Sequence, residues 1–135
     1  MNPGPAPRRR ISRHRASDYW QVSTHLMESA RTLLTLGDKE YGNAIGICII
    51  HAVISANDAI TIHLGEVRSP SEQHADAQRL LLEVATKVPE KVLRAYASVV
   101  QAKYEYSGDV FTPSTARRLL VKAEVFYDWV REQLR

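Results

Sequence analysis

One stretch of the chain is strongly apolar and uncharged over the length of a helix. Residues 41–57 contain no Lys, Arg, Asp or Glu, and the apolar character continues past Asp58 to Leu64. A helix that faces water on one side normally carries charged residues there, so this pattern predicts a helix buried on most sides. We expect the other segments of the chain to pack around this core helix.

Apolar residues at three- and four-residue steps predict an amphipathic helix before this stretch. Its apolar face consists of Tyr19, Val22, Leu26, Ala30, Leu33 and Leu34. Ser17 or Asp18 can cap this helix, and Gly37 ends it. Asp38 is then expected to cap the core helix, and a connection this short makes the two helices antiparallel. The first half of the chain therefore predicts an antiparallel helical hairpin.

Two further helices are predicted after the core helix. The first is short and runs from residue 72 to about residue 86, with Ser69 or Ser71 as its cap. The second begins near Pro89, because proline suits the first turn of a helix, and it ends at the break formed by residues 107–109. Its inward-facing residues are expected to be Val92, Leu93, Tyr96, Val99, Val100 and Tyr104.

The last helix has the clearest start signal in the chain. Thr112 supplies a hydroxyl cap and Pro113 occupies the first helical position, and an apolar face then continues to Leu134. No strand pattern and no internal repeat appear in the sequence. The predicted fold class is therefore all-α, an antiparallel up-and-down bundle of four long helices plus one shorter helix.

The length and the distribution of charge predict one domain with a basic tail. The chain has 135 residues, of which 44% are apolar, enough for a single core. Residues 1–16 contain five arginines and no acid, whereas the rest of the chain contains 13 basic and 15 acidic residues. The proline-rich start has nothing to pack, so we expect residues 1–16 to be a disordered basic tail and residues 17–135 to form the helical bundle. Such a tail can also bind the phosphates of a nucleic acid.

Several classes of protein do not fit the sequence. Cys48 is the one cysteine, so a disulfide framework and a thiolate site for zinc or iron–sulfur are not expected. The most apolar window is interrupted by polar residues and falls short of the ~20 residues that span a membrane. The arginines near the start precede no apolar run of the kind that forms a secretory signal. We expect a cytoplasmic protein with no metal, no cofactor and no membrane association.

Four parts of the sequence carry a resemblance to a known family. They are the Leu-Gly-Asp end of the first helix, the run AIGICIIHAVISANDAI, His74 at the start of the third helix, and KAEVFYDWV near the C-terminus. Over residues 18–134 the chain resembles the HEPN domain superfamily, antiparallel helical bundles of about this length found in toxin–antitoxin and defence systems. These are packing motifs, so they imply the fold more directly than the activity.

The resemblance implies a homodimer and two kinds of activity. Family members are similar to metal-independent ribonucleases or to their inactive relatives, and their partners include an antitoxin or a nucleotidyltransferase. The nuclease members carry an Arg with four to six residues before a His, late in the bundle. Here that place reads AKYEYSG, with Lys103 and Tyr104 and no His downstream. This departure from the family's pattern favours a binding protein over a nuclease, with Lys103 and Tyr104 as binding or interface candidates.

One pair of residues elsewhere has the nuclease spacing. Arg68 and His74 are separated by five residues, and an Arg can steady a phosphate while a His moves the proton of a ribose 2′-hydroxyl. The spacing alone is nonspecific, since Arg8 and Arg9 have it relative to His14. Two interpretations remain for Arg68 and His74: a metal-independent catalytic pair, or residues that cap a helix or form a dimer interface.

Polar residues of the core helix form a second candidate site. Cys48, His51, Ser55 and Asp58 fall on one stripe of the helix, and Asn57 lies beside it. A hydrolytic triad needs its His between nucleophile and acid, which this order does not provide. His51 and Asp58 are roughly 10 Å apart along the axis, too far for one metal ion.

Two interpretations of this stripe remain. In the first, His51 and Asp58 are core residues, Asp58 being paired with an Arg or Lys from a neighbouring helix because an unpaired buried carboxylate is costly. In the second, the stripe lines a ligand pocket.

Three functions follow from the sequence. The first is a non-catalytic HEPN-like dimeric bundle that binds a partner protein, RNA or a nucleotide. The second is a metal-independent ribonuclease toxin that uses Arg68 and His74 from both protomers. The third is a structural adaptor without a ligand. Trp20 and Trp129 lie beside the apolar faces of their helices rather than in the centre, which is typical of a protein interface.

Overall fold

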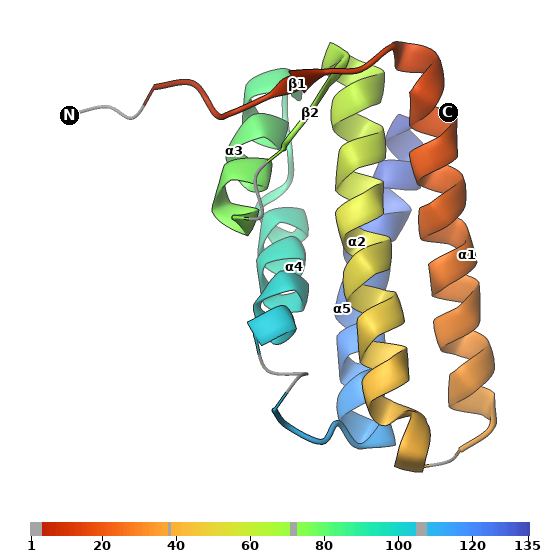
Figure 1. Cartoon of the computed structure of the whole chain (residues 1–135). Coiled ribbons are helices and arrows are strands. Elements are labelled where there is room, and N and C mark those ends of the chain that lie inside the picture. The colour runs from red at the N-terminus through yellow and green to blue at the C-terminus, as the bar shows by residue number, and fades with distance from the viewer. Residues whose placement is uncertain (1–3, 38, 71–72, 105–107) are drawn as a thin grey trace.

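The computed structural model describes residues 4–37, 39–70, 73–104 and 108–135 (Figure 1). This part of the chain forms five α-helices, namely α1 (Ala16–Thr35), α2 (Gly42–Gly65), α3 (His74–Val84), α4 (Glu90–Gln101) and α5 (Pro113–Gln133). Two short strands, β1 (Arg9–Arg10) and β2 (Val67–Arg68), pair with each other, and the single 3₁₀ turns are η1 (Arg13–Arg15), η2 (Lys39–Tyr41) and η3 (Ala102–Tyr104). The predicted all-α class is confirmed, apart from this small two-stranded sheet.

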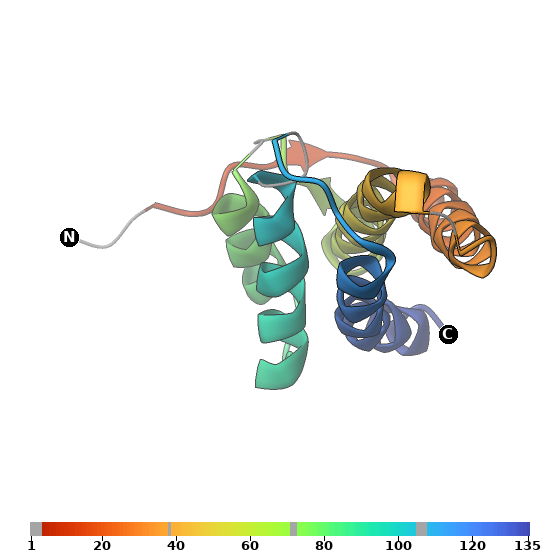
Figure 2. The same ribbon diagram turned by 90° about the horizontal axis from the view of Figure 1, so that it is seen from below.

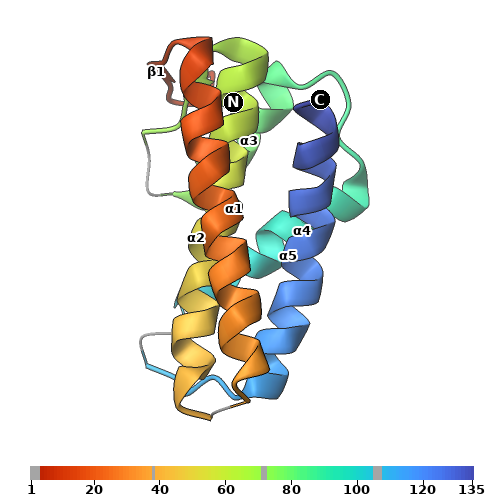
Figure 3. The same ribbon diagram turned by 90° about the vertical axis from the view of Figure 1, so that its right-hand side faces the viewer.

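The core helix α2 contacts each of the other four helices. It forms the predicted antiparallel hairpin with α1, as Figures 1 and 3 show. The hairpin is held partly by Ser23, which is buried and donates a 2.6 Å hydrogen bond to the carbonyl of Ala52. Gly37 follows α1 with a φ of 65°, a left-handed conformation that glycine adopts without strain. The expected cap at Asp38 lies outside the described residues.

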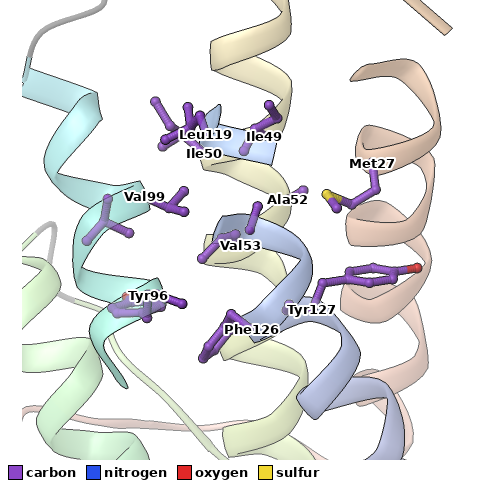
Figure 4. Packing of buried hydrophobic residues seen from close by; sticks show 14 of the residues in the cluster. Met27, Ile49, Ile50, Ala52, Val53, Tyr96, Val99, Leu119, Phe126 and Tyr127 are labelled. Atoms are coloured by element: carbon purple, nitrogen blue, oxygen red, sulfur yellow. The ribbon is translucent and has the colours of Figure 1, made fainter. Parts of the chain in front are cut away.

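The hydrophobic core lies where α1, α4 and α5 face α2 (Figure 4). Met27 of α1 and Ile49 of α2 are both fully buried. On the other side of α2, the ring of Tyr96 lies 5.1 Å from that of Phe126, in a tilted arrangement that joins α4 to α5. The predicted apolar faces of these helices are largely confirmed, but Val22 of the first helix is 49% exposed.

The lengths of the helices differ from the prediction. Within the described chain α1, α2 and α5 are long, with 20, 24 and 21 residues, whereas α3 and α4 have only 11 and 12. The two short helices lie on one side of α2, and the view from below places α4 between α3 and α5 (Figure 2). Thus three long helices and two short ones replace the expected four and one.

The predicted cap of α5 is confirmed, whereas the caps predicted for α1 and α3 are not found among the described residues. Thr112 caps α5 as predicted, because its side chain accepts a 3.1 Å hydrogen bond from the backbone N–H of Thr115. The residue before α3 is Gln73, so Ser69 does not cap that helix, and Ser71 lies outside the described residues. The hydroxyl of Ser17 bonds back to the carbonyl of His14 instead of capping α1.

The loop before α5 is fixed against the first turn of α2. The side chain of Asn43 donates to the carbonyl of Asp109 at 2.8 Å and accepts from the backbone N–H of Phe111 at 2.9 Å. Phe111 is buried against Gly42 and Gly46, where an added Cβ would meet its carbonyl oxygen and its ring. The two glycines therefore create the space that this loop occupies.

The N-terminal segment lies against the bundle, which differs from the disordered tail that the sequence predicts. β1 pairs antiparallel with β2, with Arg9 opposite Arg68. Ala6 is buried with Val67 and Leu80, and its backbone N–H donates a 2.9 Å hydrogen bond to Glu83. Small side chains and backbone hydrogen bonds, rather than an apolar stripe, hold this segment, so hydrophobic periodicity gives no sign of it.

By length and composition, α2 could cross a membrane. An 18-residue window has a mean hydropathy of 1.8, so α2 is longer and more apolar than the sequence analysis predicts. In the structure, however, 72% of that window is buried inside the bundle.

Candidate functional site

A cavity of about 290 Å³ lies between α2, β2 and the facing ends of α3 and α4. Its lining contains six of the eight residues that the sequence selects as candidates: His51, Asn57, Asp58, Arg68, His74 and Lys103. The fold brings them together because α2 passes behind the cavity, while His74 opens α3 and Lys103 belongs to η3. Residues up to 52 positions apart in the chain thus share one site. We call this site the cavity.

Asp58 and Arg68 form the charged pair at the base of the cavity. Arg68 donates from Nε to Oδ2 of Asp58 at 3.1 Å, and the side chains are 33% and 9% exposed respectively. The guanidinium carbon of Arg68 also lies 5.4 Å from the centre of the Tyr19 ring. The expected cation partner of Asp58 is therefore present, but it comes from β2 rather than from a neighbouring helix.

Burial controls the ionisation of Asp58. It raises the pKa of this carboxyl from 3.8 to about 6, although the charge and hydrogen bond of Arg68 act in the opposite direction. Burial also raises the pKa of the Tyr96 hydroxyl, and the negative charge of Asp58 adds to that rise. At pH 7 the carboxylate is mainly ionised, so it neutralises Arg68 while Tyr96 stays protonated.

The rest of the cavity is rich in nitrogen donors. His74 is partly buried, and burial followed by the nearby charges of Lys103 and His51 lowers the pKa of its imidazole. A neutral His74 at pH 7 can accept or donate a hydrogen bond. Because Asp58 and Arg68 cancel, Lys103 supplies the net positive charge of the described lining.

Asn57 adds a buried amide to the lining. Its Nδ2 donates to the carbonyl of Ala77 at 3.3 Å, and the residue is 1% exposed. Its Oδ1 accepts no hydrogen bond from any described residue. A buried acceptor in this state costs about 1–3 kcal/mol unless a water or a ligand satisfies it. The amide is therefore an enclosed polar group in the wall of the cavity.

The polar stripe of the core helix is not one unit in the structure. His51 is exposed, so the expectation of a hydrogen-bonded core histidine is wrong. Ser55 lines a different hollow with Tyr19, and Cys48 is absent from the cavity. The side chain of Tyr104 lies outside the described residues. The stripe separates because α1 covers the side of α2 that carries Ser55.

Two polar residues of the lining, Tyr96 and Ser69, were not selected as site candidates from the sequence. Tyr96 was assigned to the core of its helix, and Ser69 to a helix cap. Tyr96 is indeed buried, but it also contributes to the wall of the cavity. Nothing in the spacing of α4 indicates this, because its position beside Asp58 depends on the packing of two helices far apart in sequence.

The chemistry available in the cavity suits binding of an anion or a polar ring. Among the described residues, no group of three or more His, Cys, Asp and Glu could hold a metal ion. The ammonium of Lys103 and the imidazoles of His51 and His74 can form hydrogen bonds with a phosphate or a nucleobase.

Comparisons with known proteins add no assignment to this geometry. No family model, curated protein or solved structure matches the chain.

Proposed function

We propose that this protein is a non-catalytic, HEPN-like helical bundle that binds single-stranded RNA through the cavity. The observation that supports this most is the convergence of Lys103, His51 and His74 on one opening beside the buried Asn57. A phosphate needs cationic or N–H donors, and an unpaired base needs hydrogen-bonding groups. The cavity offers both within one wall of the bundle.

The state of Arg68 favours binding over cleavage. Its guanidinium is engaged by the carboxylate of Asp58 and lies over the ring of Tyr19. An Arg that stabilises a phosphoryl transition state needs a positive charge that the protein has not already neutralised, whereas the charge of Arg68 is balanced by Asp58. In this bundle, the first role of Arg68 is to compensate the buried charge of Asp58.

Equilibrium binding to RNA tests the proposal. A fluorescent single strand of about 12 nucleotides should bind the wild type, and Lys103→Ala should weaken binding roughly threefold to tenfold. Lys91→Ala removes the same charge from α4, outside the cavity, and should leave affinity unchanged. If the wild type does not bind RNA at moderate salt, the proposed function is wrong.

A metal-independent ribonuclease is the second candidate, because Arg68 and His74 line the same cavity. The purified protein is incubated with RNA in the presence and absence of chelator. We expect no cleavage. Cleavage that survives chelator and disappears in both Arg68→Ala and His74→Ala would replace the binding function with the nuclease function.

A homodimer completes the proposal, and the surface of α2 supports it. Ala44 and Ile47 are exposed on α2, Tyr41 is exposed just before it, and the helix has no charge before Asp58. An uncharged face suits a two-fold contact, because it brings no like charges together. His51 lies one turn beyond Ile47, so a contact there would place two cavities near each other.

Light scattering tests this contact. The wild type should have the mass of two chains at tens of micromolar, and Ile47→Glu should have the mass of one. A monomeric wild type would contradict the proposed dimer.

The tryptophans do not support a dimer interface, although their positions in the sequence are typical of one. Trp20 stacks on Tyr127 at 4.6 Å and Trp129 packs near Phe126 in the same chain.

A further inference from the structure

A second concave site lies between α4 and α5. This groove has a volume of about 460 Å³, and its floor consists of buried apolar residues that include Phe111 and Leu119. Its rim is polar: Gln101 comes from α4, and Thr115, Arg118 and Lys122 come from α5. We call this site the groove. It shares no lining residue with the cavity.

The charge of the groove has one sign. Its lining contains two cations and no acidic residue. Arg118 and Lys122 are exposed, lie one helical turn apart, and form no ion pair with any described residue. Most other cations on the helices differ, since Arg31, Arg79, Arg94 and Arg131 each pair with an acid. The groove is therefore an electrostatically unbalanced site that favours an anion.

The groove and the cavity are connected by a third concave site between α3 and α4. This smaller hollow, of about 250 Å³, shares His74 and Tyr96 with the cavity and Gln101 with the groove. Figure 2 shows the arrangement that makes this possible, with α4 between α3 and α5. The hollow contributes the amides of Gln73 and Gln78, which are uncharged hydrogen-bonding groups. The three sites thus adjoin one another around the C-terminal end of α4.

We infer that the groove is a second phosphate-binding subsite, and that a single-stranded nucleic acid runs from the cavity around the end of α4 to the groove. This inference rests on the proposed RNA-binding function and extends it. Arg118 and Lys122 would contact backbone phosphates, as cations do in grooves that follow a single strand. The apolar floor and the hydroxyl of Thr115 suit the ring and the edge of a base. An acidic peptide would use the cations but would leave the apolar floor without a matching group.

The test compares two double variants that lose the same charge. Arg118→Ala/Lys122→Ala removes both cations from the rim of the groove, whereas Arg117→Ala/Lys87→Ala removes two other exposed cations that do not line it. With an RNA single strand of about 12 nucleotides, the first variant should bind roughly fivefold to tenfold more weakly and the second like the wild type. The slope of log affinity against log salt should fall by about 1.4 in the first variant, since each lost phosphate contact on a single strand accounts for about 0.7.

Strand length separates a continuous path from an isolated anion site. A strand of about 3 nucleotides is too short to reach both sites, so the groove variant should bind it like the wild type or lose affinity far less than for the long strand. If a mononucleotide or an acidic peptide of equal charge binds as tightly as the long strand, the inferred path is wrong.

The same measurements distinguish failure of the inferred groove subsite from failure of the proposed RNA-binding function. If Lys103→Ala weakens RNA binding and the groove variant does not, the inference fails while the proposed function stands. If the wild type binds no RNA, both fail. Circular dichroism of each variant confirms that the helices are intact before any binding result is interpreted.

Discussion

At the scale of single residues, the ion pair of Asp58 and Arg68 decides how stability depends on pH. Asp58 has a pKa of about 6 in the folded protein and 3.8 as a model value. Between these values the folded state binds more protons than the unfolded state, so the free energy of unfolding falls as pH rises from about 4 to about 6. The ionised carboxylate is thus destabilising at neutral pH, despite its partner.

Asp58→Asn should therefore flatten this part of the pH profile. Asparagine keeps an oxygen that can accept from Arg68, and it removes the cost of a buried charge. We expect the variant to be as stable as the wild type near pH 4 and more stable by up to roughly 2 kcal/mol at pH 7. Urea unfolding at several pH values measures the difference. A variant that loses stability at pH 7 would show that the pair, and not burial, dominates.

Six of the polar residues that line the cavity were already candidates from the sequence, but their grouping was not predictable. A carboxylate in an apolar helix marks Asp58 as a residue that needs a cation. No rule of spacing predicts that the cation is Arg68, because the strand that carries it forms only by pairing with β1. For His51 the sequence prediction was wrong. Its position in an uncharged helix indicated burial, but the side chain is exposed in the structure.

At the scale of elements, two glycines of α2 determine how the loop before α5 packs. A Cβ at Gly42 would overlap the carbonyl oxygen of Phe111, and one at Gly46 would lie 2.8 Å from its ring. Gly42→Ala should destabilise the fold by roughly 1–3 kcal/mol through overpacking, despite the better helix propensity of alanine. Because a backbone carbonyl cannot move as a side chain can, Gly46→Ala should cost less than Gly42→Ala.

Gly108→Ala is the control for these variants. No described atom lies within 4 Å of the position of its added Cβ, so the substitution should change the free energy of unfolding by less than about 0.5 kcal/mol. Chemical denaturation of the three variants gives the ranking. Equal stability of Gly42→Ala and Gly108→Ala would mean that the loop is not held against α2.

The elements themselves were well predicted where local signals are strong. Thr112 and Pro113 fix the start of α5 because both act through their own backbone neighbourhood. The lengths of α3 and α4 were overestimated, since apolar spacing continues past the point where tertiary packing ends a helix. The sequence GNAIG contains the two glycines, but their purpose depends on a loop that is distant in the chain.

At the scale of the whole molecule, the placement of the N-terminal segment is the main difference from the sequence prediction. Composition indicates whether a segment can form its own core, and residues 1–16 cannot. It does not indicate whether a segment can add to a surface that already exists. Here that surface is provided by β2 and α3, against which Ala6 is buried. Strand pairing also places β1 next to Arg68, so the segment borders the cavity's charged pair.

Glu83 is the residue through which this placement can be tested. Its carboxylate accepts from the backbone N–H of Ala6 and pairs with Arg8. Both contacts lower its pKa, the hydrogen bond from Ala6 more than the charge of Arg8. The contacts are therefore fully present at neutral pH, and they weaken as pH falls through the lowered pKa and the carboxylate gains a proton. Glu83→Gln should reproduce that loss at neutral pH.

Hydrogen exchange gives the measurement. In the wild type, the amides of residues 9–11 should exchange more slowly than in a free chain, because β1 is paired and the N–H of Ile11 donates to the carbonyl of Glu66 at 2.9 Å. Glu83→Gln should speed this exchange several-fold and leave the exchange of α2 unchanged. Glu132→Gln is the matched control, because it breaks an exposed pair with Arg135 within three residues of the C-terminus. Exchange of residues 9–11 at the free-chain rate in the wild type would instead support the disordered tail that composition predicts.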